Sequence, residues 1–452
     1  MSFPRVPFAG CAATAFALAG CDFGAVHGYT PDLGTEFSST DLELIRRELG
    51  SLAEKPPDDP SNLYADDRDA ALLGQQLFFE PRYSQNGALA CATCHDPATG
   101  FQDARSNTSE GLAFTGRHSA TLINVGYGPA RTGSTVWQFW DGRADSLWSQ
   151  ALGPPESGVE MGGARTTLAL LVYDKYRQPY EAIFGAMPAL RTPTGEPVVE
   201  PGARPQLTGF PATAETRAWD ALPEALRHGI TEVYVNFGKA IAAYERLIVS
   251  RSSRFDSFYA EIAAGATRSK LLNGDEAAGL KLFVGEGKCV SCHLGPNFTD
   301  WKFHNIGVAQ EGMNIPPDDE GRAEGLAKVV ADRFNCASEW SDRSDKDGCA
   351  VNGIVADGDA TAAYRGAFKT PSLRSVSQTA PYFHTGTELT LADVVEHYDE
   401  GGDDGHYAGK LDPNVEELHL TEPERAELVA FLKTLDGEPL AESLLTKPSM
   451  PP

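Results

Sequence analysis

Apolar residues recur at three- and four-residue spacing in several stretches of the chain, which is the pattern of amphipathic helices. The clearest stretch is 226–247, with apolar side chains at Ile230, Val233, Phe237, Ile241 and Tyr244. The same spacing predicts helices over residues 39–49, 67–79, 166–184 and 425–435. Sustained alternation of apolar and polar residues, the signal of a half-buried strand, is missing from the sequence. The predicted fold class is therefore mainly α, with long loops and little β structure.

Local signals divide the chain further. Ser39 or Thr40 is available as the cap of the first helix, and Thr421-Glu422-Pro423-Glu424 has the form of a capping box at the start of the last one. Loops are expected in the segments rich in proline, glycine or acidic residues, which are 55–62, 101–133, 191–213 and 307–363. A domain boundary is expected within 250–274, where small and polar residues follow the long helix.

Two short motifs share the pattern C-x-x-C-H. They are Cys91-Ala92-Thr93-Cys94-His95 and Cys289-Val290-Ser291-Cys292-His293. C-x-x-C-H attaches a c-type haem, because the two thiols form thioethers and the adjacent histidine ligates the iron. The alternatives are zinc half-sites and redox C-x-x-C pairs. A zinc site needs two more ligands at knuckle spacing, and a redox pair does not need the histidine. The repetition favours two covalently bound c-type haems.

The repetition extends beyond the motifs. Gly74-Gln75-Gln76-Leu77-Phe78 precedes the first motif and Gly279-Leu280-Lys281-Leu282-Phe283 precedes the second. Phe101-Gln102-Asp103 and Phe298-Thr299-Asp300 follow them. We therefore expect two related cytochrome c-like haem domains, over residues 35–260 and 265–440.

Size and charge narrow the class of partner. The chain has 452 residues, of which 41% are hydrophobic and 22% charged, a normal globular composition for two to three domains. The formal net charge of -25 argues against nucleic acid and against an anionic membrane surface as partners. It suits a basic redox partner, although a merely soluble surface accounts for it equally well.

Residues 1–21 have the features of an export signal. Arg5 is followed by an apolar run over 12–19, and Leu18-Ala19-Gly20-Cys21 resembles a bacterial lipobox. The run is too short to span a bilayer. Export is expected in any case, because c-type haem is attached outside the bacterial inner membrane. The predicted location is the periplasm, with a lipid anchor at Cys21 favoured over a freely soluble form.

The remaining cysteines predict one disulfide. Of the eight cysteines, Cys11 and Cys21 lie in the signal region and four belong to the haem motifs. Cys336 and Cys349 are left over, and in an oxidising compartment such a pair indicates a disulfide that closes a short loop.

Further blocks carry a family resemblance. They are Phe139-Trp140-Asp141-Gly142-Arg143, Gln150-Ala151-Leu152-Gly153-Pro154, Lys369-Thr370-Pro371-Ser372-Leu373-Arg374 and Ala380-Pro381-Tyr382-Phe383-His384. With the haem motifs, they make residues 67–435 resemble the bacterial di-haem cytochrome c peroxidase family, which includes MauG. In that family the first haem reacts with peroxide and the second passes electrons.

The resemblance implies roles for single residues. His95 would hold the peroxidatic iron and His293 the electron-transfer iron. Gln150, Pro154 and Glu160 match the pocket over the first haem, with Glu160 as general acid and base and Gln150 as the group that orients peroxide or water. Trp140 matches the aromatic residue between the haems. Asn124, Thr379 and Pro381 match positions that hold one calcium ion.

The second haem's sixth ligand separates the branches of the family. Tyr398 stands where MauG has tyrosine and the donor-fed peroxidases have methionine, with His397 as the neighbouring rival. A phenolate stabilises oxidised iron, which favours the MauG-like branch. His384 is expected in the surroundings of the second haem. His118 is not expected to cap the first haem, so that haem should be open without prior reduction.

The expected function is that of a di-haem peroxidase-like oxidoreductase using hydrogen peroxide. The MauG-like form oxidises a side chain of a partner protein through a high-valent di-haem state. The first alternative is a cytochrome c peroxidase that removes hydrogen peroxide with electrons from a small cytochrome or cupredoxin. The second is a non-enzymatic dihaem electron-transfer cytochrome with both irons closed by protein ligands.

Overall fold

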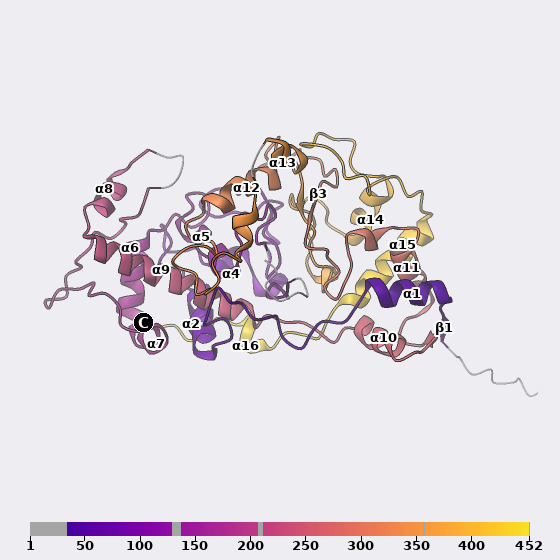
Figure 1. Ribbon diagram of the computed structural model, residues 1–452, viewed down its shortest axis with the longest axis horizontal. Coiled ribbons are helices and arrows are strands. Elements are labelled where there is room, and N and C mark those ends of the chain that lie inside the picture. Colours follow the sequence, from indigo (N-terminus) through magenta and orange to yellow (C-terminus); the bar gives the residue numbers. More distant parts are fainter. Residues whose placement is uncertain (1–33, 129–136, 207–210, 356–357, 452) are drawn as a thin grey trace, which may run out of the picture. The chain divides into compact units, whose positions relative to one another are not determined.

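Helices make up most of the regular structure in the computed structural model, which describes residues 34–128, 137–206, 211–355 and 358–451 (Figure 1). The mainly helical fold class is confirmed. The longer helices are α1 (Ser39–Glu48), α2 (Arg68–Phe78), α6 (Arg165–Leu171), α7 (Arg177–Phe184), α8 (Ala214–Asp220), α9 (Glu224–Glu245), α10 (Arg254–Ala263), α11 (Gly274–Val284), α12 (Arg322–Ala331), α14 (Leu391–Asp399) and α15 (Glu422–Leu432). Short helices are α3 (Cys91–Cys94), α4 (Leu147–Gln150), α5 (Gly153–Glu156), α13 (Gly358–Ala363) and α16 (Glu442–Leu445).

The predicted helices are present, with ends shifted by up to three residues and two further differences. The segment 307–363, expected to be a loop, contains α12, and the segment 250–274, expected as a boundary, contains α10. Ser38, and not Ser39 or Thr40, is the N-cap of α1, because its hydroxyl accepts from the Asp41 N–H while Asp41 accepts from the Ser38 N–H. The predicted helix over 166–184 is interrupted by a π-helical turn, Val172–Tyr176, between α6 and α7. Pro179 follows that turn and has no N–H to donate to the preceding turn, which explains the irregular hydrogen bonding.

The capping box predicted for the last helix is present. The Glu424 carboxylate accepts hydrogen bonds from the Thr421 N–H at 2.8 Å and from the Thr421 hydroxyl at 2.7 Å. The strands are two residues long. β1 (Thr35–Glu36) pairs with β2 (Arg268–Ser269), and β3 (Phe303–His304) pairs with β4 (Phe368–Lys369), both in the antiparallel sense.

Two hydrophobic clusters each surround one crossing of helices. In the first cluster α2 crosses α9, and in the second α11 crosses α15. The aligned glycines of the sequence repeat lie at these crossings. A Cβ on Gly74 would stand 1.9 Å from the Ala240 carbonyl oxygen, and one on Gly279 would stand 1.9 Å from the Glu427 carbonyl oxygen. Only glycine permits helices to approach so closely, so the repeated sequence reflects a repeated helix crossing.

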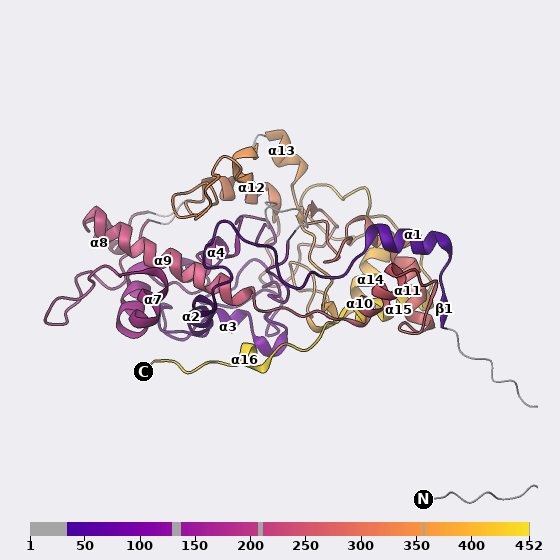
Figure 2. The ribbon, with the colours of Figure 1, turned by 60° about the horizontal axis from the view of Figure 1, so that its bottom comes forward.

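Each end of the described chain packs on the hydrophobic cluster that lies farther from it in the sequence. Phe37, Leu42 and Ile45, from the N-terminal end, are buried in the second cluster together with α10. The C-terminal segment runs beside α2 and α3 (Figure 2), and Leu444 packs against the first cluster. The limits 35–260 and 265–440 for two haem domains stay a prediction. Buried residues within 37–49 and 255–262 belong to the second cluster, although most of these positions lie inside the predicted first domain.

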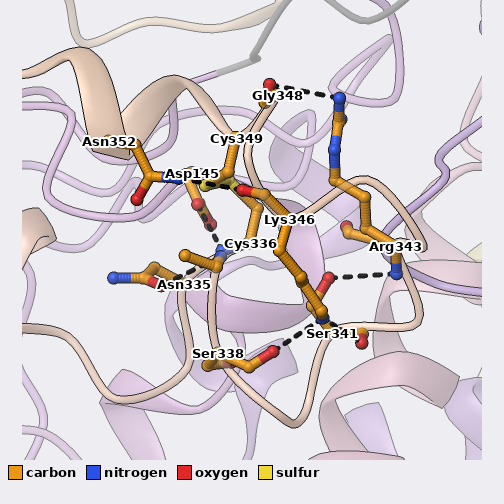
Figure 3. The surroundings of a disulfide bond; sticks show 12 residues. Asp145, Asn335, Cys336, Ser338, Ser341, Arg343, Lys346, Gly348, Cys349 and Asn352 are labelled. Atoms are coloured by element: carbon orange, nitrogen blue, oxygen red, sulfur yellow. Dashed lines mark hydrogen bonds between the residues drawn. A yellow bond between two sulfur atoms is a disulfide. The ribbon is translucent and has the colours of Figure 1, made fainter.

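Cys336 and Cys349 form a disulfide with 5.6 Å between their Cα atoms (Figure 3). Both are buried, and the Cys336 N–H donates to the Asp145 carboxylate at 2.7 Å. That bond ties the disulfide loop to the segment that carries Trp140 and α4. Within the described residues no helix combines the length and apolar character needed to cross a membrane. The lipobox and Cys21 lie outside those residues.

Candidate functional site

The first haem motif sits on the short helix α3 and the turn after it. Cys91 and Cys94 are free, half-buried thiols. The Nδ1 atom of the His95 ring lies 3.0 Å from the Phe101 carbonyl oxygen, a hydrogen bond that orients the ring. A carbonyl oxygen only accepts, so Nδ1 carries the proton and Nε2 keeps its lone pair. Phe101 is fully buried and has a left-handed backbone, with φ of 58°, which turns its carbonyl towards the ring.

The second motif repeats this arrangement. Cys289 and Cys292 are free thiols, and His293 Nδ1 lies 2.9 Å from the Phe298 carbonyl oxygen. Phe298 is fully buried and also left-handed, with φ of 53°. The phenylalanines of the sequence repeat therefore orient both histidines, which is the outer-shell support that a metal-ligating imidazole needs.

The donor sets fit c-type haem. Burial lowers the pKa of His95 and of His293, which keeps both imidazoles neutral. Burial also raises the pKa of Cys91 and of Cys289 to about 12, so these thiols stay protonated and unreactive towards other cations. Each motif offers two free thiols for thioethers and one neutral Nε2 for iron.

Glu160 belongs to a turn that is tied to the first motif through one loop. The Leu112 N–H donates to the Glu160 carbonyl at 2.9 Å. In the same loop, the Glu110 carbonyl oxygen lies 3.8 Å from Cys94 Sγ. Burial raises the pKa of the Glu160 carboxyl, while the charge of Arg143 acts in the opposite direction.

The other two residues predicted for the first-haem pocket lie just before this turn. Pro154 is in α5, and its carbonyl accepts from the Met161 N–H at 3.3 Å, next to Glu160. Gln150 ends α4. Within the described residues, the Gln150 side chain makes no hydrogen bond to Glu160, so only their segments are brought together.

Trp140 joins segments that follow the two motifs. Its indole N–H donates to the His118 carbonyl at 2.8 Å, and its own carbonyl accepts from the Lys369 N–H at 2.8 Å. The His384 ring lies edge-on, 6.5 Å from the indole between centroids, and stacks on Phe368 at 3.5 Å. The ring of His118 is engaged by the Asn107 carbonyl at 2.9 Å and the Gln102 side chain at 3.4 Å.

Tyr398 and His397 have opposite environments on α14. His397 is buried, with Nδ1 2.6 Å from the Asp403 carboxylate and Nε2 2.9 Å from the Ile306 carbonyl, so both ring nitrogens are occupied. The Tyr398 hydroxyl makes no hydrogen bond within the described residues. Burial raises its pKa, and the sulfurs of Cys292 and Cys289 add to the shift. Tyr398 therefore lies beside the second haem motif with a free oxygen.

The residues expected to hold calcium have protein partners. The Asn124 amide exchanges two hydrogen bonds with the Ser250 backbone, at 2.8 and 2.9 Å. The Thr379 hydroxyl donates to the Val376 carbonyl at 3.1 Å, and the Ala380–Pro381 bond is cis. Oxygen donors are present, and the Asn124 Oδ1 keeps a second lone pair.

One cluster beside the second motif was missed by the sequence reasoning. His304 Nε2 lies 2.9 Å from Asp300, His304 Nδ1 lies 2.6 Å from Asp412, and the Asp300 N–H donates to the Cys292 carbonyl. The hydrogen bond to Asp300 is the main cause that raises the pKa of His304, and the two carboxylates favour the protonated ring. The repeat marked Asp300, but Asp412 is 108 residues from His304 and carries no sequence signal.

Comparisons with known proteins identify the family of this chain. The profile of the di-haem cytochrome c peroxidase family matches residues 68–264. The chain is 30% identical to the methylamine utilization protein MauG of Methylorubrum extorquens over 384 residues, which cover 84% of this chain and 80% of that protein. It is also 30% identical to the cytochrome-c peroxidase IdrP1 of Denitromonas iodatirespirans over 386 residues, covering 82% of this chain and 83% of that one.

A solved structure shares the fold. It is a MauG-like protein associated with microbial copper homeostasis, which superimposes with a TM-score of 0.58 at 24% identity and covers 88% of this chain and 97% of its own. Taken with the two haem motifs and the identities above, the chain belongs to the di-haem cytochrome c peroxidase family, whose members are oxidoreductases with two c-type haems.

Proposed function

We propose that this enzyme uses hydrogen peroxide to oxidise a side chain of a partner protein, as the MauG-like branch does. The observation that carries the proposal is the pair on α14, where His397 is fully hydrogen-bonded and Tyr398 has a free oxygen beside the second motif. Bound haem supplies the iron that exchanges electrons with peroxide. A phenolate from Tyr398 would disfavour reduction of the iron of the second haem, which suits storage of oxidising equivalents better than uptake of electrons from a donor.

Glu160 is the proposed carrier of the proton at the first haem. Cleavage of the peroxide bond requires a group that takes a proton from one oxygen and returns it to the other. A half-buried carboxyl with a raised pKa suits that task better than an exposed one, because it takes up a proton more readily. Gln150 and Pro154 are the proposed neighbours that orient the peroxide and limit the space.

Trp140 is the proposed electron relay between the two haems. Its contacts support this role, since it bonds to His118 on the side of the first motif and to Lys369 on the side of the second. The engaged ring of His118 supports a first haem without a histidine cap. Such a haem needs no prior reduction before it meets peroxide.

The second candidate is removal of hydrogen peroxide with electrons from a small cytochrome or cupredoxin. The identity of 30% to a cytochrome-c peroxidase favours it. The net charge of -25 would attract a basic donor. The two candidates differ in whether the second haem is easily reduced.

The same resemblance supports two further proposals. One calcium ion would bind near Asn124, Thr379 and Pro381, because Asn124 Oδ1 has a lone pair left and calcium accepts amide and carbonyl oxygens. The enzyme would act in the periplasm, where c-type haem is attached, with a lipid anchor at Cys21.

Stopped-flow spectroscopy of the diferric holoprotein with one equivalent of hydrogen peroxide tests the proposed function. We expect both haem spectra to change without added reductant. A reaction that begins only after one haem has been reduced would favour the donor-fed peroxidase instead. No reaction in either state would leave the electron-transfer cytochrome.

The role of Glu160 is tested by Glu160→Gln, which should slow the peroxide reaction by roughly 10²-fold or more, as expected for loss of a general acid and base. Both haems should stay attached. Glu110→Gln is the matched control, because Glu110 lies in the loop that contacts the first motif, yet its side chain is exposed. An unchanged rate in Glu160→Gln would remove Glu160 from this role.

A further inference from the structure

A cavity of about 390 Å³ lies beside the β3 segment that follows the second haem motif. Four of its lining residues are aromatic, namely Trp137, Trp301, Phe303 and Tyr364. Its basic lining residues are Lys302, His304 and Arg322, of which His304 is paired with Asp300 and Asp412, and Lys302 lies 3.9 Å from Asp300. None of the described residues that line it is acidic, although the whole chain carries a net charge of -25. The volume is in the range of sites for small ligands.

Arg322 is the central charge of this cavity. It is 4% exposed, and its guanidinium carbon lies 4.5 Å from the centre of the Trp137 ring and 4.3 Å from that of Phe303. One nitrogen, Nη1, donates to the carbonyls of Asp141 and Gly142. Within the described residues, the Nε and Nη2 atoms make no hydrogen bond, and no carboxylate forms an ion pair with this arginine.

Desolvation of a buried guanidinium is costly, and the two carbonyls, the two aromatic faces and the charge of Asp141 offset that cost only in part. Burial accordingly lowers the pKa of Arg322 to about 10. Two of its nitrogens remain available, and a planar carboxylate is the group that matches such a fork. The aromatic walls favour a flat apolar group next to that carboxylate.

We propose that this cavity binds a small aromatic carboxylate, whose carboxylate pairs with Arg322 and whose ring packs against the aromatic walls. The cavity adjoins two segments of the site described above. Arg322 holds the carbonyls directly after Trp140, and Trp301 follows Asp300, whose N–H donates to the Cys292 carbonyl. Binding of the carboxylate in this cavity does not depend on any step of the peroxide reaction, so it can be tested independently of the proposed function.

Isothermal titration calorimetry of the holoprotein tests the proposal with two probes, indole-3-propionate and its neutral amide. We expect the acid to bind and the amide to bind at least tenfold more weakly. Arg322→Gln should weaken binding of the acid tenfold or more. Lys328→Gln is the matched control, because it removes one charge from the same helix α12 at a position outside the cavity. No binding of the acid at millimolar concentration, or equal binding of acid and amide, would overturn the proposal.

A second variant guards against misfolding of Arg322→Gln. Val355 is 64% exposed at the cavity, so Val355→Glu should fold and should repel the acid more than the amide. Val330→Glu, 45% exposed on α12 and outside the lining, should leave both affinities unchanged. Equal effects of the two substitutions would refute the site.

The same chemistry occurs in proteins, where an aromatic residue stands next to an acidic one. The peptide N-acetyl-Asp-Trp-amide is therefore a third probe. Binding of the peptide without binding of the free acid would assign the cavity to a protein partner and overturn the small-molecule proposal. Peroxide reactivity measured on the same samples reports on the proposed function separately, because no substituted residue lies at the first motif.

Discussion

Tyr398 and His397 are neighbouring candidates for the sixth ligand of the second haem. Two hydrogen bonds occupy both ring nitrogens of His397, whereas the Tyr398 oxygen has no hydrogen-bond partner among the described residues. Tyr398→Phe should raise the reduction potential of the second haem by roughly 0.1 V or more, since axial ligands set haem potentials over a range of about 0.8 V. Spectroelectrochemical titration measures this potential.

The matched control for Tyr398→Phe is Tyr259→Phe. Tyr259 is a partly buried tyrosine packed against the second hydrophobic cluster, to which α14 contributes Leu391 and Val395, and it is not a candidate ligand. Its substitution should leave both potentials in place. A second-haem potential that is equal in Tyr398→Phe and in the unsubstituted protein would refute the ligand and weaken the MauG-like proposal.

Asp145 is a buried carboxyl whose charge costs stability (Figure 3). Burial raises its pKa from 3.8 to about 6, and one oxygen, Oδ1, has no hydrogen-bond partner within the described residues. At a pH below the pKa of Asp145 in the unfolded chain, this carboxyl is protonated in both the folded and the unfolded state, so no charge is buried on folding. As pH rises from about 4 to beyond about 6 the folded protein must ionise Asp145 at a cost.

Urea unfolding of the holoprotein against pH tests this expectation. The stability of the protein relative to Asp145→Asn should fall as pH rises through that window and level off above it. Asp347→Asn is the control, because Asp347 is exposed in the same disulfide loop. A difference that is constant with pH would contradict the raised pKa.

The sequence marked candidate site residues through its short motifs, through the internal repeat and through the family resemblance. His95 and His293 followed from their motifs, and Tyr398 followed from the family resemblance. Arg322 was missed because its importance comes from Trp137 and Phe303, which meet it only in the folded chain. Contacts between distant segments leave no periodic signal.

At the scale of elements, the helix crossings repeat as the sequence does. Gly279→Ala would place a methyl group 1.9 Å from the Glu427 carbonyl oxygen and 2.9 Å from the Phe431 Cβ, so α11 and α15 must separate. We expect a loss of about 1–3 kcal/mol or more from this overpacking. Thermal unfolding of the holoprotein measures it.

Gly274→Ala is the matched control on the same helix. Gly274 is the first residue of α11, and a Cβ there would meet nothing within 4 Å. Its substitution should change stability little. If the two substitutions had equal effects, the close crossing would not be the reason for the repeated glycine.

Helices were predictable where the apolar periodicity extends over many residues, as in α9. Interruptions within helices and the exact ends of helices were not predictable from this periodicity. The π-helical turn Val172–Tyr176 interrupts a stretch whose apolar spacing alone predicts one helix, because Pro179 changes the hydrogen bonding without changing the spacing. The N-cap of α1 is Ser38, one residue before the predicted candidates, because Ser38 exchanges hydrogen bonds with Asp41.

At the scale of the whole molecule, the termini stabilise the haem motif that is distant in sequence. The C-terminal segment is tied to the first cluster by hydrogen bonds. Gln75 donates to the Ser443 carbonyl at 2.6 Å, and the Tyr244 hydroxyl donates to the Leu444 carbonyl at 2.6 Å. The apolar side chains that pack there are Leu440, Leu444, Leu445 and Met450. A division of the chain into two consecutive domains hides this dependence.

A chain that ends at Glu438 should therefore lose stability around the first motif and keep it around the second. Each partly buried apolar side chain that is removed costs on the order of 1 kcal/mol. Hydrogen–deuterium exchange of the holoprotein should show faster exchange in α2 and α9, because they lose these contacts, with unchanged exchange in α11. Leu444→Ala should give a smaller change in the same helices. If exchange became faster by the same factor in α2 and α11, the residues after Glu438 would stabilise the whole chain. If exchange became faster in α11 alone, these residues would stabilise the second motif and not the first.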